Sequence, residues 1–249
     1  MIEDLISVII PHYKVPGFEQ DYLYQALDCL VRQTYKNFEV RITLDCPNKD
    51  YIVKTIELIE NYRSKGLKIF LNIRQDYEPS IPDTRNTCIV SAKGEWFIFL
   101  DSDNWLDDNW LEVMHSKGKE VYPKIAFSAA ENYNDRTGAS YIVEGPLDHQ
   151  WIYTPDAITK HRTKPLFGQV FLHRNHLEKV GFLFDPNIKI YETSLMMMKL
   201  IRWFRFTYVG ETKIHTRDWA GAISRRLDDD AYNKKDWAKK AADYFMETK

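Results

Sequence analysis

Residues 92–110 read AKGEWFIFLDSDNWLDDNW, and the apolar run from Trp96 to Leu100 ends abruptly in two carboxylates, Asp101 and Asp103. Burying an unpaired carboxylate costs free energy, or the group becomes neutral through a pKa shift. A strand that ends in two carboxylates therefore indicates that these charges have a functional role. Open α/β sheets bind ligands at the carboxyl ends of their strands, where such a pair can hold a divalent cation against nucleotide phosphates. A plain polar turn is the alternative, because Asp, Ser and Asn are common turn residues. Spacing alone favours neither interpretation.

Upstream of this stretch, short apolar runs alternate with amphipathic segments, a pattern typical of a mainly parallel sheet flanked by helices. The run from Leu5 to Pro11 is continuously apolar, as expected for a strand buried on both faces. The pattern predicts strands over residues 5–11, 37–45, 66–73 and 96–100, and helices over residues 21–33, 51–62 and 82–92. Ile52, Ile56 and Ile59 are expected on the buried stripe of the second helix. The acidic pair therefore follows the fourth strand of an α/β fold.

The second half of the chain is less regular. We expect strands around residues 125–128 and 140–143, joined by the turn sequence NDRTG, and another strand at QVFLHR, residues 169–174. A helix is predicted from Tyr191 to Phe204, followed by two short strands about a glycine in TYVGETKIH, residues 207–215. The tail from Asp228 to Lys249 is expected to be a helix that packs on the domain rather than on an anionic membrane.

Composition narrows the class of protein. The 249 residues are 44% hydrophobic, which is ample for a core, and the formal charge of −2 gives no electrostatic footprint for nucleic acid. The three cysteines form no CxxC pair, so they are expected to be reduced thiols of a cytoplasmic protein. No apolar run approaches the ~20 residues that a membrane-spanning helix needs. We expect a cytoplasmic protein, with peripheral attachment to a membrane left open.

Three segments together resemble a known family. SVIIPHYK, QTYKNFEVRITLD and DTRNTCIVSAKGEWFIFLDSDNW are similar, in order and spacing, to the successive motifs of family 2 glycosyltransferases. The match covers residues 5–115 and, more weakly, residues 166–224. It implies the GT-A fold, a Rossmann-like, mainly parallel sheet flanked by helices, with a smaller mixed region on the acceptor side. It also implies an inverting, usually metal-dependent transferase that uses a nucleotide-sugar.

The resemblance also implies how the chain is organised. We expect one GT-A domain over residues 1–225, with a nucleotide-sugar half over residues 1–115 and an acceptor half over residues 116–225. A C-terminal helix over residues 226–249 would follow. The oligomeric state cannot be read from the sequence.

The donor-binding residues that the resemblance implies lie at the ends of the first two strands and in the acidic motif. They are Pro11, His12, Tyr13, Asp45, Arg85, Asp101 and Ser102. Tyr13 can stack on a nucleobase, and Asp45 can accept a hydrogen bond from a ring N–H such as that of uracil. The second acid that the family often has after this position is replaced by Cys46. A surface tyrosine and a turn-forming aspartate are the structural alternatives.

Metal binding is implied for Asp103 and Asp101, whose carboxylates suit Mg²⁺ or Mn²⁺. Arg85 could donate two hydrogen bonds to a phosphate, support the acidic motif, or be an exposed arginine on a helix. His215 is the candidate for a further metal ligand, although a lone histidine is more often structural. Aligning RDWAGAIS on the late motif of the family instead puts Trp219 where a histidine is frequent.

The general base is implied to come from KIYETSLMMMKL, where the acidic pair of the family has become Glu192 and Thr193. Glu192 is the one carboxylate in that motif. If the alignment with the family is shifted by one residue, Thr193 occupies the position of the base, and a threonine cannot act as a general base. An acid at a helix start can instead stabilise the helix by about 0.3–1 kcal/mol through the macrodipole. Trp151, Tyr153 and Tyr191 could stack on sugar faces in an acceptor cleft, with core packing as the default.

The sequence therefore predicts a transferase that moves a sugar from a nucleoside diphosphate, UDP by family frequency, to a hydroxyl acceptor. The acceptor could be a glycan, a lipid-linked sugar or a protein, and the near-neutral charge disfavours a nucleic acid without excluding it. A catalytically weak nucleotide-sugar or glycan-binding protein with the same fold is the alternative. A sugar nucleotidyltransferase is disfavoured, because PHYKVPG offers Gly17 alone where that chemistry needs a glycine-rich loop.

Overall fold

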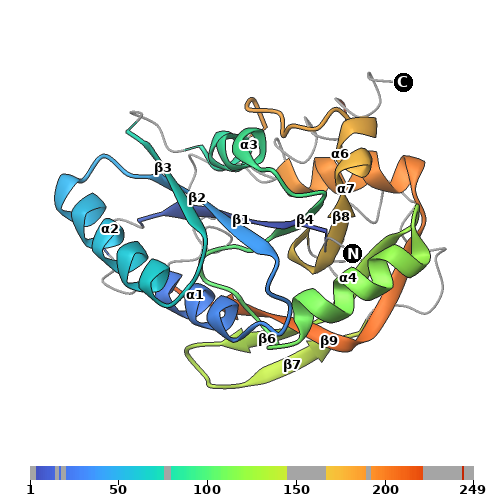
Figure 1. The fold of residues 1–249 in the computed structure, drawn as a ribbon, viewed down its shortest axis with the longest axis horizontal. Coiled ribbons are helices and arrows are strands. Elements are labelled where there is room, and N and C mark those ends of the chain that lie inside the picture. Colours follow the sequence, from blue (N-terminus) through green and yellow to red (C-terminus); the bar gives the residue numbers. More distant parts are fainter. Residues whose placement is uncertain are drawn as a thin grey trace.

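Strand β1 (Ile6–Tyr13) lies near the centre of a twisted sheet, and the residues from Ile6 to Ile10 are fully buried. The structure is a computed structural model that describes residues 4–14, 17, 21–75, 80–144, 167–188, 192–220 and 243. Strands β2 (Phe38–Asp45) and β4 (Trp96–Phe99) flank β1, and β3 (Ile69–Arg74) lies outside β2, with all four strands parallel (Figure 1). This is the predicted parallel sheet.

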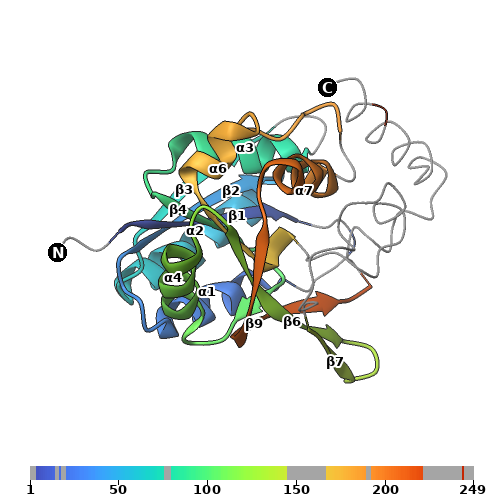
Figure 2. The ribbon, with the colours of Figure 1, turned by 90° about the vertical axis from the view of Figure 1, so that its right-hand side faces the viewer.

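Helices cover both faces of the sheet (Figure 2). Helices α1 (Leu23–Arg32), α2 (Lys49–Ser64) and α4 (Trp110–Val121) lie on one side, where their apolar residues pack with Ile6, Val8 and Ile10. Helices α3 (Ile81–Ser91), α6 (Arg174–Lys179) and α7 (Glu192–Trp203) lie on the other, where their apolar residues pack in one cluster with Ile9. Because side chains alternate along a strand, the continuous apolar run of β1 supplies both cores.

The second half of the chain extends the same sheet. Strand β8 (Val170–His173) follows the short 3-10 helix η2 (Phe167–Gln169) and pairs antiparallel with β4. Beyond it come β6 (Ile125–Asn134), β9 (Phe206–Asp218) and the two-residue strand β5 (Trp105–Leu106), while β7 (Ser140–Val143) pairs with β6 as the predicted hairpin. The order in the described chain is β3-β2-β1-β4-β8-β6-β9-β5.

Two details of the sequence prediction were wrong. TYVGETKIH lies within one strand, β9, whose register against β6 jumps from Val209 opposite Ser128 to Lys213 opposite Ala129. The glycine therefore marks a bulge rather than a break, since extra residues can loop out of a strand without ending it. Ile56 is 38% exposed, whereas Ile52 and Ile59 are buried as expected.

Some predicted features fall outside the described residues. They are most of the C-terminal helix, over residues 226–249, and the aromatic residues Trp151, Tyr153 and Tyr191. Among the helices that are described, none has the length and apolar character to span a membrane.

The turn before β4 is locked against β1 at Gly94. Its N–H donates to Ser7 Oγ, 2.9 Å away, and Ser7 Oγ in turn donates to Glu39 Oε1 in β2 at 2.7 Å. A methyl group on Gly94 would come within 2.6 Å of Ser7 N and 2.8 Å of the Leu5 carbonyl oxygen. The segment that carries the acidic motif therefore enters the sheet at a position where only glycine fits.

We expect Gly94→Ala to lower the free energy of unfolding by about 1–3 kcal/mol or more, because the new methyl group meets backbone atoms that cannot move aside. Urea denaturation followed by circular dichroism measures this difference. Gly210→Ala is the matched control, since its methyl group would meet mainly the Tyr208 side chain, at 3.3 Å. Equal stability of the two variants would contradict the expectation.

Candidate active site

The carboxyl ends of β1, β2 and β4 lie side by side, because these strands are adjacent and parallel. Pro11 and Tyr13, both partly exposed, lie in β1, and Tyr13 pairs in register with Asp45 at the end of β2. Residues 101–104, the acidic loop, follow β4 at the same edge. One edge of the sheet thus gathers the end of β1, Asp45 and the acidic pair.

Asp45 is almost fully buried at 2% exposure. Its Oδ2 accepts hydrogen bonds from the Ser80 N–H at 2.9 Å and from Thr84 Oγ at 3.2 Å, both at the start of α3. Arg74 Nη1 lies 3.9 Å from the same oxygen. The other oxygen, Oδ1, is buried and has no hydrogen-bond partner within the described residues. A buried acceptor without a donor is costly, so Oδ1 is suited to a donor that a ligand brings.

The acidic loop folds as a tight turn, in which the Asn104 N–H donates to the Asp101 carbonyl oxygen at 3.0 Å. Asp103 Oδ2 accepts a hydrogen bond from the Trp219 indole N–H at 2.9 Å. Enclosure by protein and the nearby charge of Asp101 raise the pKa of Asp103 to about 6. Two carboxylates held this close favour a cation between them or a proton on one of them.

Arg85 in α3 connects the acidic loop to the second half of the chain. The side chain is buried, and its Nη2 donates to Asp101 Oδ1 at 2.8 Å while Nη1 donates to Glu192 Oε1. Burial opposes the charge of the guanidinium, yet Asp101 and Glu192 together raise the pKa of Arg85. Of the predicted alternatives, the structure shows Arg85 bracing the acidic loop rather than lying exposed on the helix.

Glu192 is the first residue of α7 and is buried beside Arg85. Burial raises the pKa of the Glu192 carboxyl, and the Arg85 charge opposes this shift without cancelling it, because Arg85 is shared with Asp101. A raised pKa brings a carboxylate closer to the range in which it can take up a proton near neutral pH.

His12 is buried within the same edge, with both ring nitrogens engaged. Nδ1 lies 3.0 Å from Ser102 Oγ in the acidic loop, and Nε2 lies 2.7 Å from the Tyr51 hydroxyl in α2. Burial lowers the pKa of His12, so the neutral ring is favoured. Both ring nitrogens of His12 thus contact protein groups in this structure, and its donor contact stays a prediction.

Comparison with known proteins identifies the family. The model of glycosyl transferase family 2 matches residues 7–177, more than half of the chain. The chain belongs to this family.

Relatives and solved structures agree with this assignment. Glycosyltransferase GlyA of Streptococcus pneumoniae is 28% identical over 90% of this chain, and WfaP of Escherichia coli, a UDP-Glc:alpha-D-GlcNAc-diphosphoundecaprenol beta-1,3-glucosyltransferase, is 28% identical over 89%. The match spans 34% of GlyA and 80% of WfaP.

Among solved structures, Staphylococcus aureus TarS residues 1–349 in complex with UDP-GlcNAc superposes with a TM-score of 0.67 at 19% identity, covering 87% of this chain and 59% of that one. GalNAc-T7 with UDP, GalNAc and Mn²⁺ gives a TM-score of 0.62 at 18% identity, covering 86% of this chain and 44% of that one. The fold is therefore GT-A, as predicted.

His215 lies in β9, where it pairs in register with Trp105 of β5. Its Nε2 lies 2.8 Å from Asp107 Oδ1, its Nδ1 lies 3.2 Å from Glu131 Oε2, and its ring stacks on Trp105 at 5.0 Å. No group of three His, Cys, Asp or Glu side chains in the described chain could hold a metal ion. These contacts hold His215 within the protein, and its metal contact stays a prediction.

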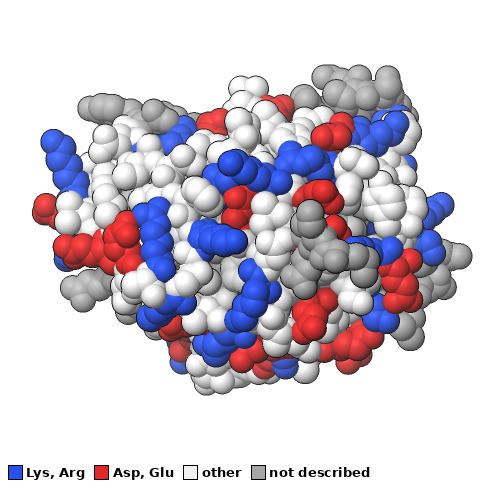
Figure 3. Space-filling model, in the orientation of Figure 1, with Lys and Arg blue, Asp and Glu red and all other residues white. Residues whose placement is uncertain are grey.

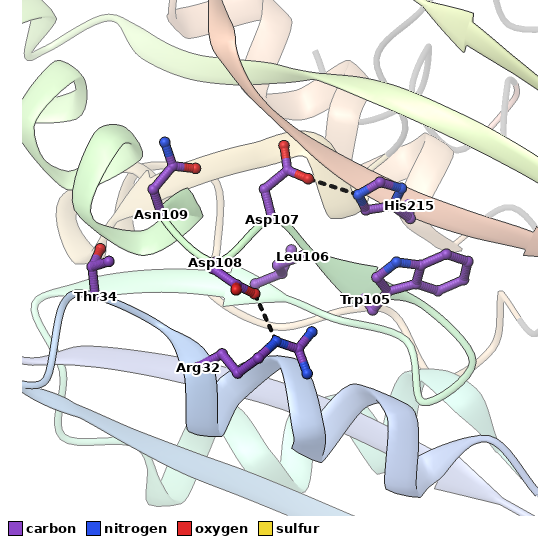
Figure 4. A pocket seen from close by; sticks show the side chains of 8 residues that line it. All are labelled: Arg32, Thr34, Trp105, Leu106, Asp107, Asp108, Asn109 and His215. Carbon is purple, nitrogen blue, oxygen red and sulfur yellow. Dashed lines mark hydrogen bonds and ion pairs between the residues drawn. The ribbon is translucent and has the colours of Figure 1, made fainter.

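An open hollow of about 470 Å³ lies beside His215, at the junction of β5, β9 and the end of α1 (Figure 4). Asp107 bonds to His215 on one side of it, and Asp108 Oδ1 accepts a hydrogen bond from Arg32 Nε at 2.9 Å on the other. On the face of the molecule seen in Figure 3, acidic and basic side chains are interspersed rather than segregated. This face carries no extended patch of one charge.

The sequence prediction missed how much of the site would come from the end of β9 and from Trp219, which directly follows this strand. Besides Trp219, Arg217 donates through its backbone N–H to Asn104 Oδ1 at 3.1 Å, and its guanidinium bonds to Asp135 and Gln25. Trp219 also meets Tyr22 edge-on, at 5.2 Å between ring centroids. The alignment of RDWAGAIS was the one sequence signal for these contacts, since it put Trp219 at a late-motif position.

The acidic pair fits a cation site that is completed by a substrate. Magnesium and manganese are commonly bound by one or two carboxylates together with substrate phosphate oxygens and water. Asp101 and Asp103 supply two carboxylates, and burial together with the nearby charge of Asp101 disfavours the ionised form of Asp103 when no cation is present. The donor set is therefore suited to Mg²⁺ or Mn²⁺ bound together with a diphosphate.

Proposed function

We propose that this protein is an inverting glycosyltransferase that moves a sugar from a UDP-linked donor to a hydroxyl of a glycan or lipid-linked acceptor. One observation carries the proposal: at one edge of the sheet lie Asp45, with a buried oxygen that has no donor, and the acidic pair, which Arg85 connects to the buried carboxylate of Glu192. The neighbouring structures of TarS with UDP-GlcNAc and of GalNAc-T7 with UDP support the class of donor.

The nucleobase would be bound at Asp45. Its Oδ1 lacks a donor, and the N3–H of uracil is a donor that could supply this hydrogen bond. Tyr13, beside Asp45 in register, offers an aromatic face for stacking. A cytosine or adenine ring presents a different pattern of donors and acceptors, so this carboxylate would contribute to selection of the base.

The diphosphate would be bound at the acidic loop. A divalent cation held by Asp101 and Asp103 would act as a Lewis acid that offsets the charge growing on the leaving phosphate. Arg85 keeps Asp101 in place through the hydrogen bond between them. Its second bond, to Glu192, fixes the spacing between the donor side and the base.

The transfer step would use Glu192 as general base. As the acceptor oxygen forms its bond to the anomeric carbon, the acceptor O–H proton passes to Glu192, and the bond from that carbon to the β-phosphate oxygen breaks. UDP leaves on the face opposite the attacking oxygen, so the configuration inverts. Burial excludes water from this carboxylate, and its raised pKa favours proton uptake.

The class of acceptor rests on relatives. WfaP is named for transfer to a diphosphoundecaprenol-linked sugar and TarS for transfer to poly(ribitol-phosphate), which supports a lipid-linked sugar or a polymer as the class of acceptor. The division into a donor half, residues 1–115, and an acceptor half, residues 116–225, remains a proposal, as does the cytoplasmic location.

Thermal stabilisation of the purified protein tests the donor site. UDP, GDP, CMP and dTDP sugars would each be added at millimolar concentration, with Mn²⁺ or with a chelator. We expect UDP-sugars to raise the melting temperature in the presence of Mn²⁺ and to do so less with the chelator. No shift with any donor would contradict the proposal and favour a binding protein of the same fold.

Asp45→Asn is expected to weaken UDP binding by about tenfold to a hundredfold, because one amide oxygen can still accept from Ser80 while the NH₂ group would face the donor N–H of the base. Isothermal titration calorimetry with UDP measures the change. Asp83→Asn, on the more exposed side of α3, is the control. Unchanged UDP affinity in Asp45→Asn would exclude this residue from base recognition.

A further inference from the structure

A chain of hydrogen bonds runs from the start of α1 to the acidic loop. The Tyr51 hydroxyl in α2 donates to Asp21 Oδ2, and the same hydroxyl oxygen lies 2.7 Å from His12 Nε2. His12 Nδ1 lies 3.0 Å from Ser102 Oγ, between the two acids of the loop. Asp21 is itself fixed by the Leu23 N–H, which donates to its Oδ1 at 3.0 Å.

The carboxylate at one end sets the direction of every bond in this chain. An ionised carboxylate can only accept, so the Tyr51 O–H must point at Asp21. The Tyr51 oxygen is then an acceptor toward His12, which requires the proton of the neutral ring on Nε2. His12 Nδ1 is left as an acceptor, and Ser102 must donate its O–H to it.

We infer that Asp21, Tyr51 and His12 form a relay that makes Ser102 a hydrogen-bond acceptor only, and that this oxygen selects a donor nucleotide carrying a free ribose hydroxyl. The inference rests on the proposed function and adds the selectivity of its donor site. His12 and Tyr51 are positioning residues, since they act through Ser102.

The surroundings of Ser102 explain why the direction of its hydroxyl hydrogen bond would affect ligand binding. Its side chain is partly exposed, and with the O–H turned inward, its lone pairs are available to a ligand. Asp101 and Asp103 on either side hold the cation in the proposed function, so the Ser102 oxygen is the acceptor between them that is left for the nucleotide. A ribose hydroxyl can donate to this oxygen, whereas a deoxyribose analogue leaves an acceptor without its donor.

Nuclear magnetic resonance tests the relay without any ligand. A long-range ¹H–¹⁵N correlation spectrum distinguishes the two neutral tautomers of histidine, and His12→Gln assigns the His12 signals among those of the seven histidines. We expect the tautomer protonated at Nε2 in the wild type. A ring protonated at Nδ1, or at both nitrogens near neutral pH, would overturn the inference.

Binding of UDP, 2′-deoxy-UDP and 3′-deoxy-UDP in the presence of Mn²⁺ tests the selectivity. The wild type should favour UDP over at least one deoxy analogue by about tenfold, the effect of one net hydrogen bond. Tyr51→Phe leaves His12 Nε2–H without its acceptor, so the ring can take the other tautomer and Ser102 can turn its hydroxyl outward. The preference should then fall to about two- to threefold.

Tyr62→Phe is a matched control, because Tyr62 is also in α2 and its hydroxyl also donates to an aspartate of α1, Asp28, at 2.7 Å. It should keep the full preference for UDP. A full preference in Tyr51→Phe, or none in the wild type, would overturn the selectivity. Failure of all variants and the wild type to bind UDP would instead contradict the proposed function, and the tautomer measurement would still decide the relay.

Discussion

Glu192→Gln is expected to lower kcat for sugar transfer by about 10²–10⁴-fold, the usual contribution of a general base. The amide cannot take up the acceptor proton, but it can still accept the hydrogen bond from Arg85, so the loop and the donor site should persist. Affinity for UDP should therefore stay close to that of the wild type. Steady-state kinetics with a UDP-sugar, together with calorimetric titration of UDP, separate the two effects.

Glu178→Gln in α6 is the control, since this exposed acid lies outside the proposed site. Its kcat should match the wild type. Transfer by Glu192→Gln that stays within a few-fold of the wild type would mean that another group is the base, and a helix-start role for Glu192 would then account for its position.

The pH dependence of kcat gives a second test of Glu192. A base must be ionised before catalysis, and burial holds the pKa of this carboxyl above its ordinary value of 4.5. The rate should therefore fall as the pH drops through the raised value, so that the acidic limb of the profile lies above pH 4.5. In Glu192→Gln the contribution of Glu192 to this limb should be lost, while the contribution of Asp103, whose pKa is raised to about 6, should remain.

Asp103→Asn should produce the other large effect, a loss of about 10³-fold in turnover, because a Lewis acid at the leaving diphosphate contributes several kcal/mol. The amide oxygen can still accept from the Trp219 N–H, so the acidic loop should keep its shape. Binding of Mn²⁺ in the presence of UDP, followed by electron paramagnetic resonance, should weaken in parallel with the rate.

Asp108→Asn is the matched control, because Asp108 is an exposed acid five residues after Asp103 and accepts a hydrogen bond from Arg32. It should leave turnover and Mn²⁺ binding unchanged. An Asp103→Asn variant that binds Mn²⁺ as tightly as the wild type would remove Asp103 from the proposed cation site.

Much of the fold follows from local patterns. The continuous apolar run of β1 and the amphipathic spacing of α1 are set by which faces must be buried, and burial leaves a periodic trace in the sequence. The local pattern gives a wrong prediction where the pairing between strands determines the structure. Gly210 looks like a strand break, but β9 continues because ten residues of β6 pair with it across a bulge.

Some features of the candidate site can likewise be predicted from local sequence, and others cannot. The sequence could determine that Asp45, Asp101 and Asp103 lie at the carboxyl ends of parallel strands, which carry these ends to one edge, and the structure puts the two strands, β2 and β4, on either side of β1. It could also place Glu192 at a helix start. The bond between Glu192 and Arg85 joins residues 107 positions apart, and no local rule predicts which carboxylate a buried guanidinium will meet.

By itself, then, the sequence determined the succession of strands and helices along the donor half and the residue types at the strand ends, since both depend on short-range periodicity and spacing. Only the tertiary structure decided that His12 turns inward to Ser102 and Tyr51, that Trp219 reaches Asp103, and that His215 lies between Asp107 and Glu131. The physical reason is that hydrogen bonds act over about 3 Å and depend on direction. Their partners are fixed only when segments distant in the sequence have packed together.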